Sequence, residues 1–253
     1  MPRSFFCVSQ AKPVLLEVDE INTYRGPAHI LRGVSINVDT DEVVALVGRN
    51  GAGRTTIIES ITGLLPVRSG RIRFRQEEIT SLPTHRRAKR GIGYAPENSG
   101  IFPDLTVAEN LMISRWLSAK TGRRAATSGD GDAETGAFRV FPEVRPLLGR
   151  QGLNLSGGQK KMVAIARAMA LAPYLLILDE AFEGLAPAVV KRFREAVMTI
   201  KAMGISLLIA ESNLVSAAAI ADRLYVIDRG EILFSGTPQQ ALADEGVMRA
   251  LRG

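Results

Sequence analysis

Several features that define whole classes of protein are missing from this chain of 253 residues. The single cysteine, Cys7, cannot form an internal disulfide and excludes a cysteine-rich metal centre. No uninterrupted apolar run approaches the roughly 18–20 residues that a membrane-crossing helix needs, so the sequence predicts no membrane span. The apolar stretch Phe5 to Val8 is too short for the core of a secretory signal peptide, and we expect no export.

Aromatic residues are also few, at 6%, and they do not alternate with basic residues. The chain has 32 Lys and Arg against 26 Asp and Glu, a net charge of +6, and such an excess can attract nucleic acid or an anionic membrane surface. The densest basic group, residues 85–90, has no interleaved aromatic side chain on which bases could stack. We therefore expect no nucleic-acid partner.

The hydrophobic content of 46% and the charged content of 23% are ordinary for a soluble globular protein, so a buried core is expected. The length suits one large domain or one domain with a modest subdomain, and no internal repeat is visible. The first third holds short apolar segments between turn residues, whereas after Gly157 helices alternate with continuous apolar strands. Strands that are apolar throughout are buried on both faces, which predicts a parallel sheet and an α/β fold. The expected strands are 14–18, 34–38, 43–47, 72–74, 175–178, 206–210 and 224–227, and the expected helices are 157–170, 188–203 and 214–221.

A further helix is expected from Thr106, because threonine is followed three positions later by an acidic residue and then by apolar residues at helical spacing. Residues 118–136 are small, polar and rich in glycine, with almost nothing to bury, and predict an exposed, mobile loop.

The most informative segment is 43–65, where an apolar strand, a glycine-rich turn and a helix follow one another. Gly48, four residues, Gly53, Arg54 and Thr55 fit the P-loop pattern GxxxxGK[ST], except that arginine replaces lysine. The glycines let successive backbone N–H groups surround phosphate oxygens, and the helix N-terminus adds partial positive charge. The alternative is a glycine-rich turn in another doubly wound domain.

The arginine bears on what such a site can do. Lysine delivers a compact charge from within the loop, whereas arginine is a longer planar fork, so the exchange is not conservative. The backbone turn and the hydroxyl of Thr55, the expected Mg²⁺ ligand, are retained. We therefore expect nucleotide binding to survive better than turnover.

Two later segments could serve the same chemistry. Ser156, Gly157 and Gly158 open a long helix, where free N–H groups form another anion site, although alone this segment could be only a capped helix. The apolar strand that follows ends in Asp179 and Glu180, which can hold Mg²⁺ through water and position an attacking water. An acidic pair at the end of a buried strand is also common in α/β proteins without such a role.

Three motifs follow one another in the chain: the P-loop, LSGGQ at 155–159 and LLILDE at 175–180. In this order, and with Tyr24 upstream, they resemble the nucleotide-binding domain of ABC transporters, and the resemblance covers residues 13–253. The resemblance implies an ATPase with a P-loop NTPase (RecA-like) core, an N-terminal antiparallel β subdomain and an inserted α-helical subdomain at about 98–170. Residues 1–12 would be an N-terminal extension. It also implies ATP and Mg²⁺ as cofactors, transmembrane permease partners, and a peripheral place on the cytoplasmic face of the inner membrane.

The resemblance further implies head-to-tail pairing with an identical or different ATPase subunit, so that LSGGQ acts on nucleotide held by the partner. Tyr24 takes the place of an adenine-stacking aromatic, although core packing would also explain it. The implied catalytic residues are Glu180, Glu97 and Ser212; the implied Mg²⁺ ligands are Thr55, Asp179 and Glu97; the implied nucleotide-binding residues are Tyr24, Gly48, Asn50, Gly51, Ala52, Gly53, Arg54, Thr55, Thr56, Ser156, Gly157, Gly158 and Gln159.

Three departures narrow the family. Glu97 stands where a glutamine is usual, and Ser212 replaces the switch histidine and is too short for its γ-phosphate hydrogen bond. In the segment after Glu180, Ala181 replaces the usual proline, and residues 184–187 stand where a segment with an aspartate is common. With the C-terminal segment 236–253, these features look like one of the two ATPase subunits of branched-chain amino acid importers, which work with a periplasmic solute-binding protein. The surface that couples to the membrane subunits would then lie near 99–116.

Within that group Arg54 and Ser212 look unusual. They are either harmless drift or the mark of a degenerate regulatory subunit that binds ATP while a second subunit hydrolyses it. A soluble ABC protein that acts on DNA or ribosomes is a further alternative, but those proteins usually carry two such domains or a long coiled-coil insertion, and this chain has neither.

Overall fold

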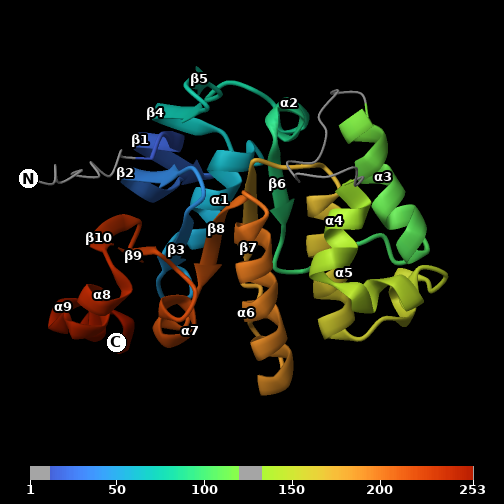
Figure 1. Ribbon diagram of the computed structural model, residues 1–253. Coiled ribbons are helices and arrows are strands. Elements are labelled where there is room, and N and C mark those ends of the chain that lie inside the picture. Colours follow the sequence, from blue (N-terminus) through green and yellow to red (C-terminus); the bar gives the residue numbers. More distant parts are fainter. Residues whose placement is uncertain (1–11, 120–132, 253) are drawn as a thin grey trace, which may run out of the picture.

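The computed structural model describes residues 12–119 and 133–252, which form two sheets with helices packed around them (Figure 1). The larger sheet has six strands in the order β10-β9-β3-β8-β7-β6, and every pair is parallel except β9 with β10. All residues of β3, β7 and β8 are buried, as their continuous apolar sequences predict. The strands are β3 (Val43–Val47), β6 (Ile92–Ala95), β7 (Leu175–Asp179), β8 (Ser206–Glu211), β9 (Arg223–Asp228) and β10 (Glu231–Gly236).

The smaller sheet is antiparallel in the order β2-β1-β4-β5, at the N-terminal part of the chain. The segments expected at 14–18, 34–38 and 72–74 form parts of longer strands, because polar residues alternate with buried ones along the rest of each strand. The predicted α/β class with an N-terminal antiparallel sheet is confirmed. These strands are β1 (Val14–Arg25), β2 (Ala28–Asp39), β4 (Val67–Phe74) and β5 (Glu77–Glu78).

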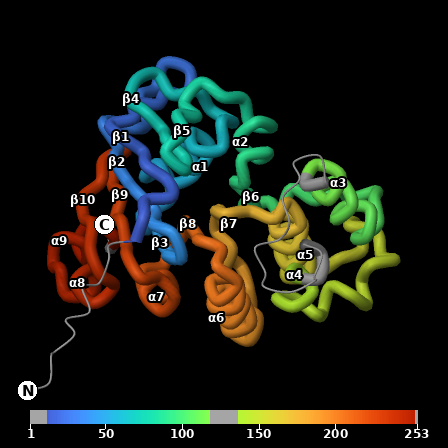
Figure 2. Tube along the Cα trace, turned by 45° about the horizontal axis from the view of Figure 1, so that its top comes forward, coloured from blue at the N-terminus to red at the C-terminus, as the bar shows by residue number. Residues whose placement is uncertain are grey.

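The helices divide into groups that lie apart in both the ribbon view of Figure 1 and the tube view of Figure 2. α3, α4 and α5 lie together on the side of β6, and α7, α8 and α9 lie near β9 and β10. The helices are α1 (Arg54–Thr62), α2 (Thr84–Arg90), α3 (Val107–Ala119), α4 (Ala133–Val140), α5 (Gly157–Met169), α6 (Pro187–Ala202), α7 (Leu214–Ala218), α8 (Pro238–Ala243) and α9 (Glu245–Arg252), with 3₁₀ turns η1 (Pro142–Leu147) and η2 (Gly152–Asn154). No helix in these described ranges combines the length and apolarity needed to cross a membrane.

The loop expected over 118–136 is wrong at both ends. α3 continues to Ala119, and α4 begins at Ala133. The short α4 carries Ala137 and Phe138 into the core beside α5, a packing that the polar sequence before it does not reveal. Residues 120–132, the middle of the expected loop, lie outside the described part, as does most of the expected N-terminal extension.

A buried arginine joins α1 to the segment before α2. Arg87 is 2% exposed, and its guanidinium donates hydrogen bonds to the carbonyls of Ser60 and Ile61 in α1 and of Thr80 and Leu82. The cation therefore satisfies carbonyl groups at the C-terminal end of α1, where the helix dipole favours positive charge. This contact fixes the far end of the helix whose first turn faces the candidate site.

Candidate functional site

An open cavity of about 380 Å³ lies around the turn between β3 and α1. Its walls come from the smaller sheet, from the turn itself with the first residues of α1, and from the segments that follow β6 and β7. The cavity therefore sits beyond the carboxyl ends of parallel strands, where α/β proteins commonly bind ligands. The residues that line it are Arg25, Ile30, Asn50, Gly51, Gly53, Arg54, Thr55, Thr56, Glu97, Glu180 and Glu183.

Glycine is required at particular positions of this turn. Gly51 and Gly53 have φ angles of +81° and +117°, which side chains disfavour. A Cβ at Gly48 would lie 2.6 Å from the backbone oxygen of Ile227, so this position needs glycine because β9 is so close. Gly53 precedes α1 without a side-chain cap, so the first N–H groups of the helix are left without a side-chain acceptor.

The arginine of the P-loop is engaged with groups of the chain itself. Arg54 is 4% exposed, and its Nη2 donates to Asn50 Oδ1 at 3.0 Å and to Glu180 Oε1 at 2.5 Å. Its Nη1 is buried without a hydrogen-bond partner in the described chain. Burial lowers the pKa of Arg54, while the nearby carboxylates of Asp179 and Glu211 act in the opposite direction. One guanidinium nitrogen is thus buried without a partner in the described chain.

Three carboxylates converge on the same cavity. Oxygens of Glu97, Glu180 and Glu183 all lie within 4.8 Å of one another, with Glu180 buried and the other two exposed. Like charges this close repel one another and also repel phosphate unless a cation lies among them. Of the predicted Mg²⁺ ligands, Glu97 belongs to this cluster and Asp179 does not. Thr55 lines the same cavity as the cluster.

Asp179 offers a better test of whether these residues fit a divalent cation. Both of its carboxylate oxygens are buried, and neither has a hydrogen-bond partner of normal geometry in the described ranges, although the hydroxyls of Thr55 and Tyr94 are close enough to interact with it. Burial raises the pKa of Asp179 to about 6, and the adjacent hydroxyl of Thr55 opposes that rise. An orphaned carboxylate beside a hydroxyl is the oxygen donor set that Mg²⁺ takes, usually with water. The residues present therefore fit the ion.

The backbone of Glu180 is unusual. Its φ angle is +48°, in the left-handed region that a glutamate rarely adopts. Its N–H donates to the carbonyl of Ala210 in β8 at 3.0 Å, and its carbonyl accepts from the ammonium of Lys161 in α5 at 2.6 Å. The same ammonium donates to the carbonyl of Glu183 at 2.8 Å. The turn after β7 is therefore held from two sides.

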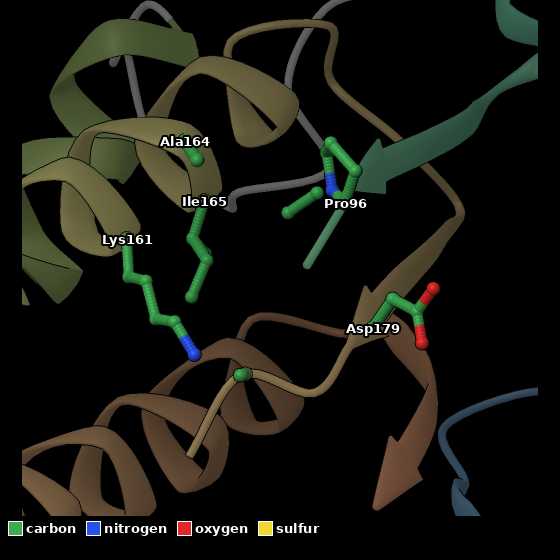
Figure 3. A pocket seen from close by; sticks show the side chains of 7 residues that line it. Pro96, Lys161, Ala164, Ile165 and Asp179 are labelled. Atoms are coloured by element: carbon green, nitrogen blue, oxygen red, sulfur yellow. The ribbon is translucent and has the colours of Figure 1, made fainter. Parts of the chain in front are cut away.

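Lys161 and Asp179 also line a small cavity of about 10 Å³ between α5 and the ends of β6 and β7. Figure 3 shows the ammonium group of Lys161 directed from α5 toward the chain that follows β7, whereas the carboxylate of Asp179 points away from it. Burial lowers the pKa of Lys161, while Glu211, Glu183 and Glu97 favour its charged form. The lysine is thus a partly buried cation surrounded by carboxylates.

Glu211 closes this group of charges from β8. It is 2% exposed, and one of its oxygens accepts a hydrogen bond from the N–H of Phe182. Burial raises the pKa of Glu211 to about 7, and Arg54 and Lys161 oppose that rise. Ser212, the next residue, is exposed and does not line the P-loop cavity.

Other predicted site residues lie elsewhere. Ser156 caps α5 in a reciprocal capping box with Gln159, at an exposed helix start that does not line the P-loop cavity. Tyr24 stacks on His29, with ring centroids 4.3 Å apart and planes 5° from parallel, and it is also absent from the cavity wall. Nucleotide stacking on Tyr24 stays a prediction.

The sequence analysis did not single out four residues that the structure places at the site. Arg25 lines the cavity and donates to Thr56, Glu183 supplies the third carboxylate, and Lys161 and Glu211 hold the turn after β7. Glu183 follows Glu180 by three positions and could have been suspected from that spacing. Nothing in the sequence ties Lys161 to that turn.

Comparison with known proteins places the chain among nucleotide-driven transport proteins. Residues 31–183 match the family model described as ABC transporter. A lipopolysaccharide export system ATP-binding protein, LptB of Haemophilus influenzae, is 36% identical over 228 residues, 88% of this chain and 91% of that protein. The high-affinity branched-chain amino acid transport ATP-binding protein BraG of Pseudomonas aeruginosa is 31% identical over 239 residues, 94% of this chain and 100% of that protein.

Solved structures agree in fold. The ADP conformation of MJ1267, an ATP-binding cassette of an ABC transporter, superposes with a TM-score of 0.79 at 29% identity, covering 95% of this chain and 99% of that one. A nucleotide-free cassette from an ABC transporter gives a TM-score of 0.80 at 29% identity, with the same coverage.

Proposed function

Because this chain belongs to the ABC transporter family of ATP-binding proteins, we propose that it is the ATPase subunit of an importer for a small solute of the branched-chain amino acid kind. The observation that carries the hydrolytic part of the proposal is the contact between Arg54 and Glu180. It brings a carboxylate from the end of β7 to the cation of the P-loop, so the base and the phosphate site share one cavity.

The chemistry follows from the groups in that cavity. The N–H groups of the turn and the free Nη1 of Arg54 bind phosphate oxygens, and the Thr55 hydroxyl and Asp179 would hold Mg²⁺. When bound, the ion would neutralise phosphate charge. Glu180 accepts a hydrogen bond from the attacking water and orients it toward the γ-phosphate. Phosphate oxygens compete with Glu180 for Arg54, so nucleotide binding weakens the hold of the arginine on the base without removing it.

Pairing with a second ATPase subunit is part of the proposal. The start of α5 at Ser156 is exposed and contributes no residue to the wall of the P-loop cavity, which suits a role on nucleotide held by another subunit. Exposed apolar side chains at Phe102, Met112 and Trp116 suit contact with transmembrane subunits. The subunit would then lie at the cytoplasmic face of the inner membrane, with a periplasmic solute-binding protein as an indirect partner.

Import of a branched-chain amino acid is supported by the match to BraG over that protein's full length and by Glu97 and the sequence at 184–187. A second candidate is a subunit of an export system for a lipid-linked glycan, favoured by the match to LptB at 36% identity. Purification of the complex in detergent distinguishes them. Import is supported if the chain is recovered with permeases and the ATPase rate of that complex rises when a binding protein loaded with an amino acid is added. Export is supported if lipopolysaccharide raises that rate instead.

Hydrolysis itself is tested in the assembled complex by comparing wild type with Glu180→Gln. We expect wild type to turn over ATP at least about a hundredfold faster than the variant, because the base is lost while the nucleotide site remains. A wild-type rate no higher than that of Glu180→Gln would instead support the alternative hypothesis, that Arg54 and Ser212 mark a regulatory subunit that binds ATP without hydrolysing it.

A further inference from the structure

We propose that Lys161 is a positioning residue for hydrolysis, which holds the turn after β7 so that Glu180 points into the P-loop cavity. The inference rests on the proposed role of Glu180 as the base. Lys161 itself does not line that cavity and acts only through the backbone of the turn.

The need for such a residue follows from the backbone of Glu180. A glutamate with a φ angle of +48° is in the left-handed region, which is less favourable for its side chain than extended or helical backbone. Such a conformation persists only where surrounding contacts determine it. The N–H of Glu180 is fixed by the carbonyl of Ala210. Its own carbonyl accepts from the N–H of Glu183 at 3.3 Å and, at the shorter distance of 2.6 Å, from the ammonium of Lys161.

The ammonium group suits this task for two reasons. It has three donors and no acceptor, and two of the donors bind the carbonyls of Glu180 and Glu183 at 2.6 and 2.8 Å. Hydrogen bonds from a charged donor are also stronger than those between neutral groups. One side chain therefore joins the first and last residues of the segment 180–183, and the carboxylates of both residues face the same cavity.

The close view supports the same assignment (Figure 3). Lys161 extends from α5 toward the chain after β7, with its aliphatic part beside Ile165 and with Pro96 across the small cavity. The cavity has room for about one water, so the third N–H of Lys161 has space for a small partner. The lysine is anchored on a helix that packs in the core, which makes it a rigid support rather than a surface charge.

The test compares ATPase kinetics of five forms of the assembled complex: wild type, Lys161→Met, Lys161→Arg, Glu180→Gln and the control Lys191→Met. We expect Lys161→Met to lower kcat about 10- to 100-fold, because the base is displaced, while KM for ATP and the equilibrium binding of Mg-ATP change less than about twofold. Lys161→Arg retains charged donors and recovers most of kcat. Lys191→Met, which removes an exposed lysine from α6, leaves kcat unchanged.

Two outcomes would overturn the inference: an unchanged kcat in Lys161→Met, or an arginine variant no better than the methionine variant although both melt at the wild-type Tm. Should Lys161→Met not fold, the arginine variant alone decides, since a kcat at the level of Glu180→Gln in a folded protein contradicts the proposal. A wild-type rate that Glu180→Gln does not lower is a separate result, because it removes the proposed base and not merely its support.

Discussion

Arg54 and Glu180, 126 residues apart in sequence, form an ion pair in which both side chains are almost completely buried. A buried pair of this kind stabilises a geometry more than it stabilises the fold, because desolvation offsets much of the attraction. Here the geometry is that of the site without nucleotide, with the proposed base Glu180 held by the cation of the P-loop.

Shortening that cation should release the base. In Arg54→Lys a single ammonium on a shorter side chain cannot hold Asn50 and Glu180 as the planar guanidinium does. We expect kcat of the assembled complex to rise about three- to tenfold, equivalent to about 1 kcal/mol of activation free energy. The double variant with Glu180→Gln should stay inactive. A kcat equal to or below wild type would show that the pair does not restrain hydrolysis.

The raised pKa of Glu211 predicts a pH-dependent stability. Its carboxyl keeps its proton to about pH 7 in the folded chain but loses it near 4.5 when unfolded, so the folded state binds more protons between these values and its stability falls as pH rises through them. Glu211→Gln removes this loss and keeps an oxygen for the N–H of Phe182. We expect the variant to be more stable than wild type at pH 8 by on the order of 1–3 kcal/mol and equal to it near pH 4.

Urea unfolding at the two pH values measures this difference. Glu195→Gln, which removes an exposed carboxylate from α6, serves as the control and should show no such dependence. A Glu211→Gln variant that is less stable than wild type at pH 8 would mean that the attraction of Arg54 and Lys161 outweighs the burial of the carboxylate.

We expect the buried Arg87 to stabilise the folded chain through its hydrogen bonds. Arg87→Met leaves the carbonyls of Ser60, Ile61, Thr80 and Leu82 without their donor. We expect a loss of about 3 kcal/mol in the free energy of unfolding, seen as a fall in Tm of about 6–12 °C. The neighbouring Arg86 is exposed, so Arg86→Met is the control and should melt like wild type. Equal Tm values for the two variants would contradict the role given to Arg87.

The glycine at the end of β3 can be tested in the same way. In Gly48→Ala the added Cβ meets the backbone oxygen of Ile227, so β3 and the turn must move away from β9. We expect Mg-ATP affinity in equilibrium dialysis to fall about tenfold or more, since the N–H groups of the turn lose their alignment. Gly149→Ala, with open space around its Cβ, should bind like wild type. Unchanged affinity in Gly48→Ala would mean that the turn tolerates the shift.

Much of the fold could be predicted because its strands are continuous apolar runs. The expected strand 43–47 coincides with β3, and the strand expected at 175–178 falls short of β7 by one residue. β6 and α2 were not predicted, since elements of four and seven residues carry too few residues for a periodic pattern. β10 was not predicted because exposed and partly buried residues alternate along it, so it is not a continuous apolar run. α4 was taken for loop because its contacts with α5 are tertiary.

The candidate site divides along the same line. Residues within one motif, such as Gly48 to Thr55, could be found from their spacing, because the turn is local. Contacts between motifs could not, because they depend on where α5 and β8 pack against β7. Neither the grip of Lys161 on the turn after Glu180 nor the closure by Glu211 has a sequence signal.

Helix α5 begins at an exposed cap and touches the Glu180 turn through Lys161, only about one and a half helical turns further along. A helical segment this short is rigid, so a movement of its first residue also moves Lys161. In a head-to-tail pair, the cap of α5 in one subunit would contact the nucleotide held by the other subunit. A displacement of the cap would then reach, through Lys161, the Glu180 turn that lines the first subunit's own P-loop cavity. The geometry of Glu180 in each subunit would then depend on whether the other subunit has bound nucleotide.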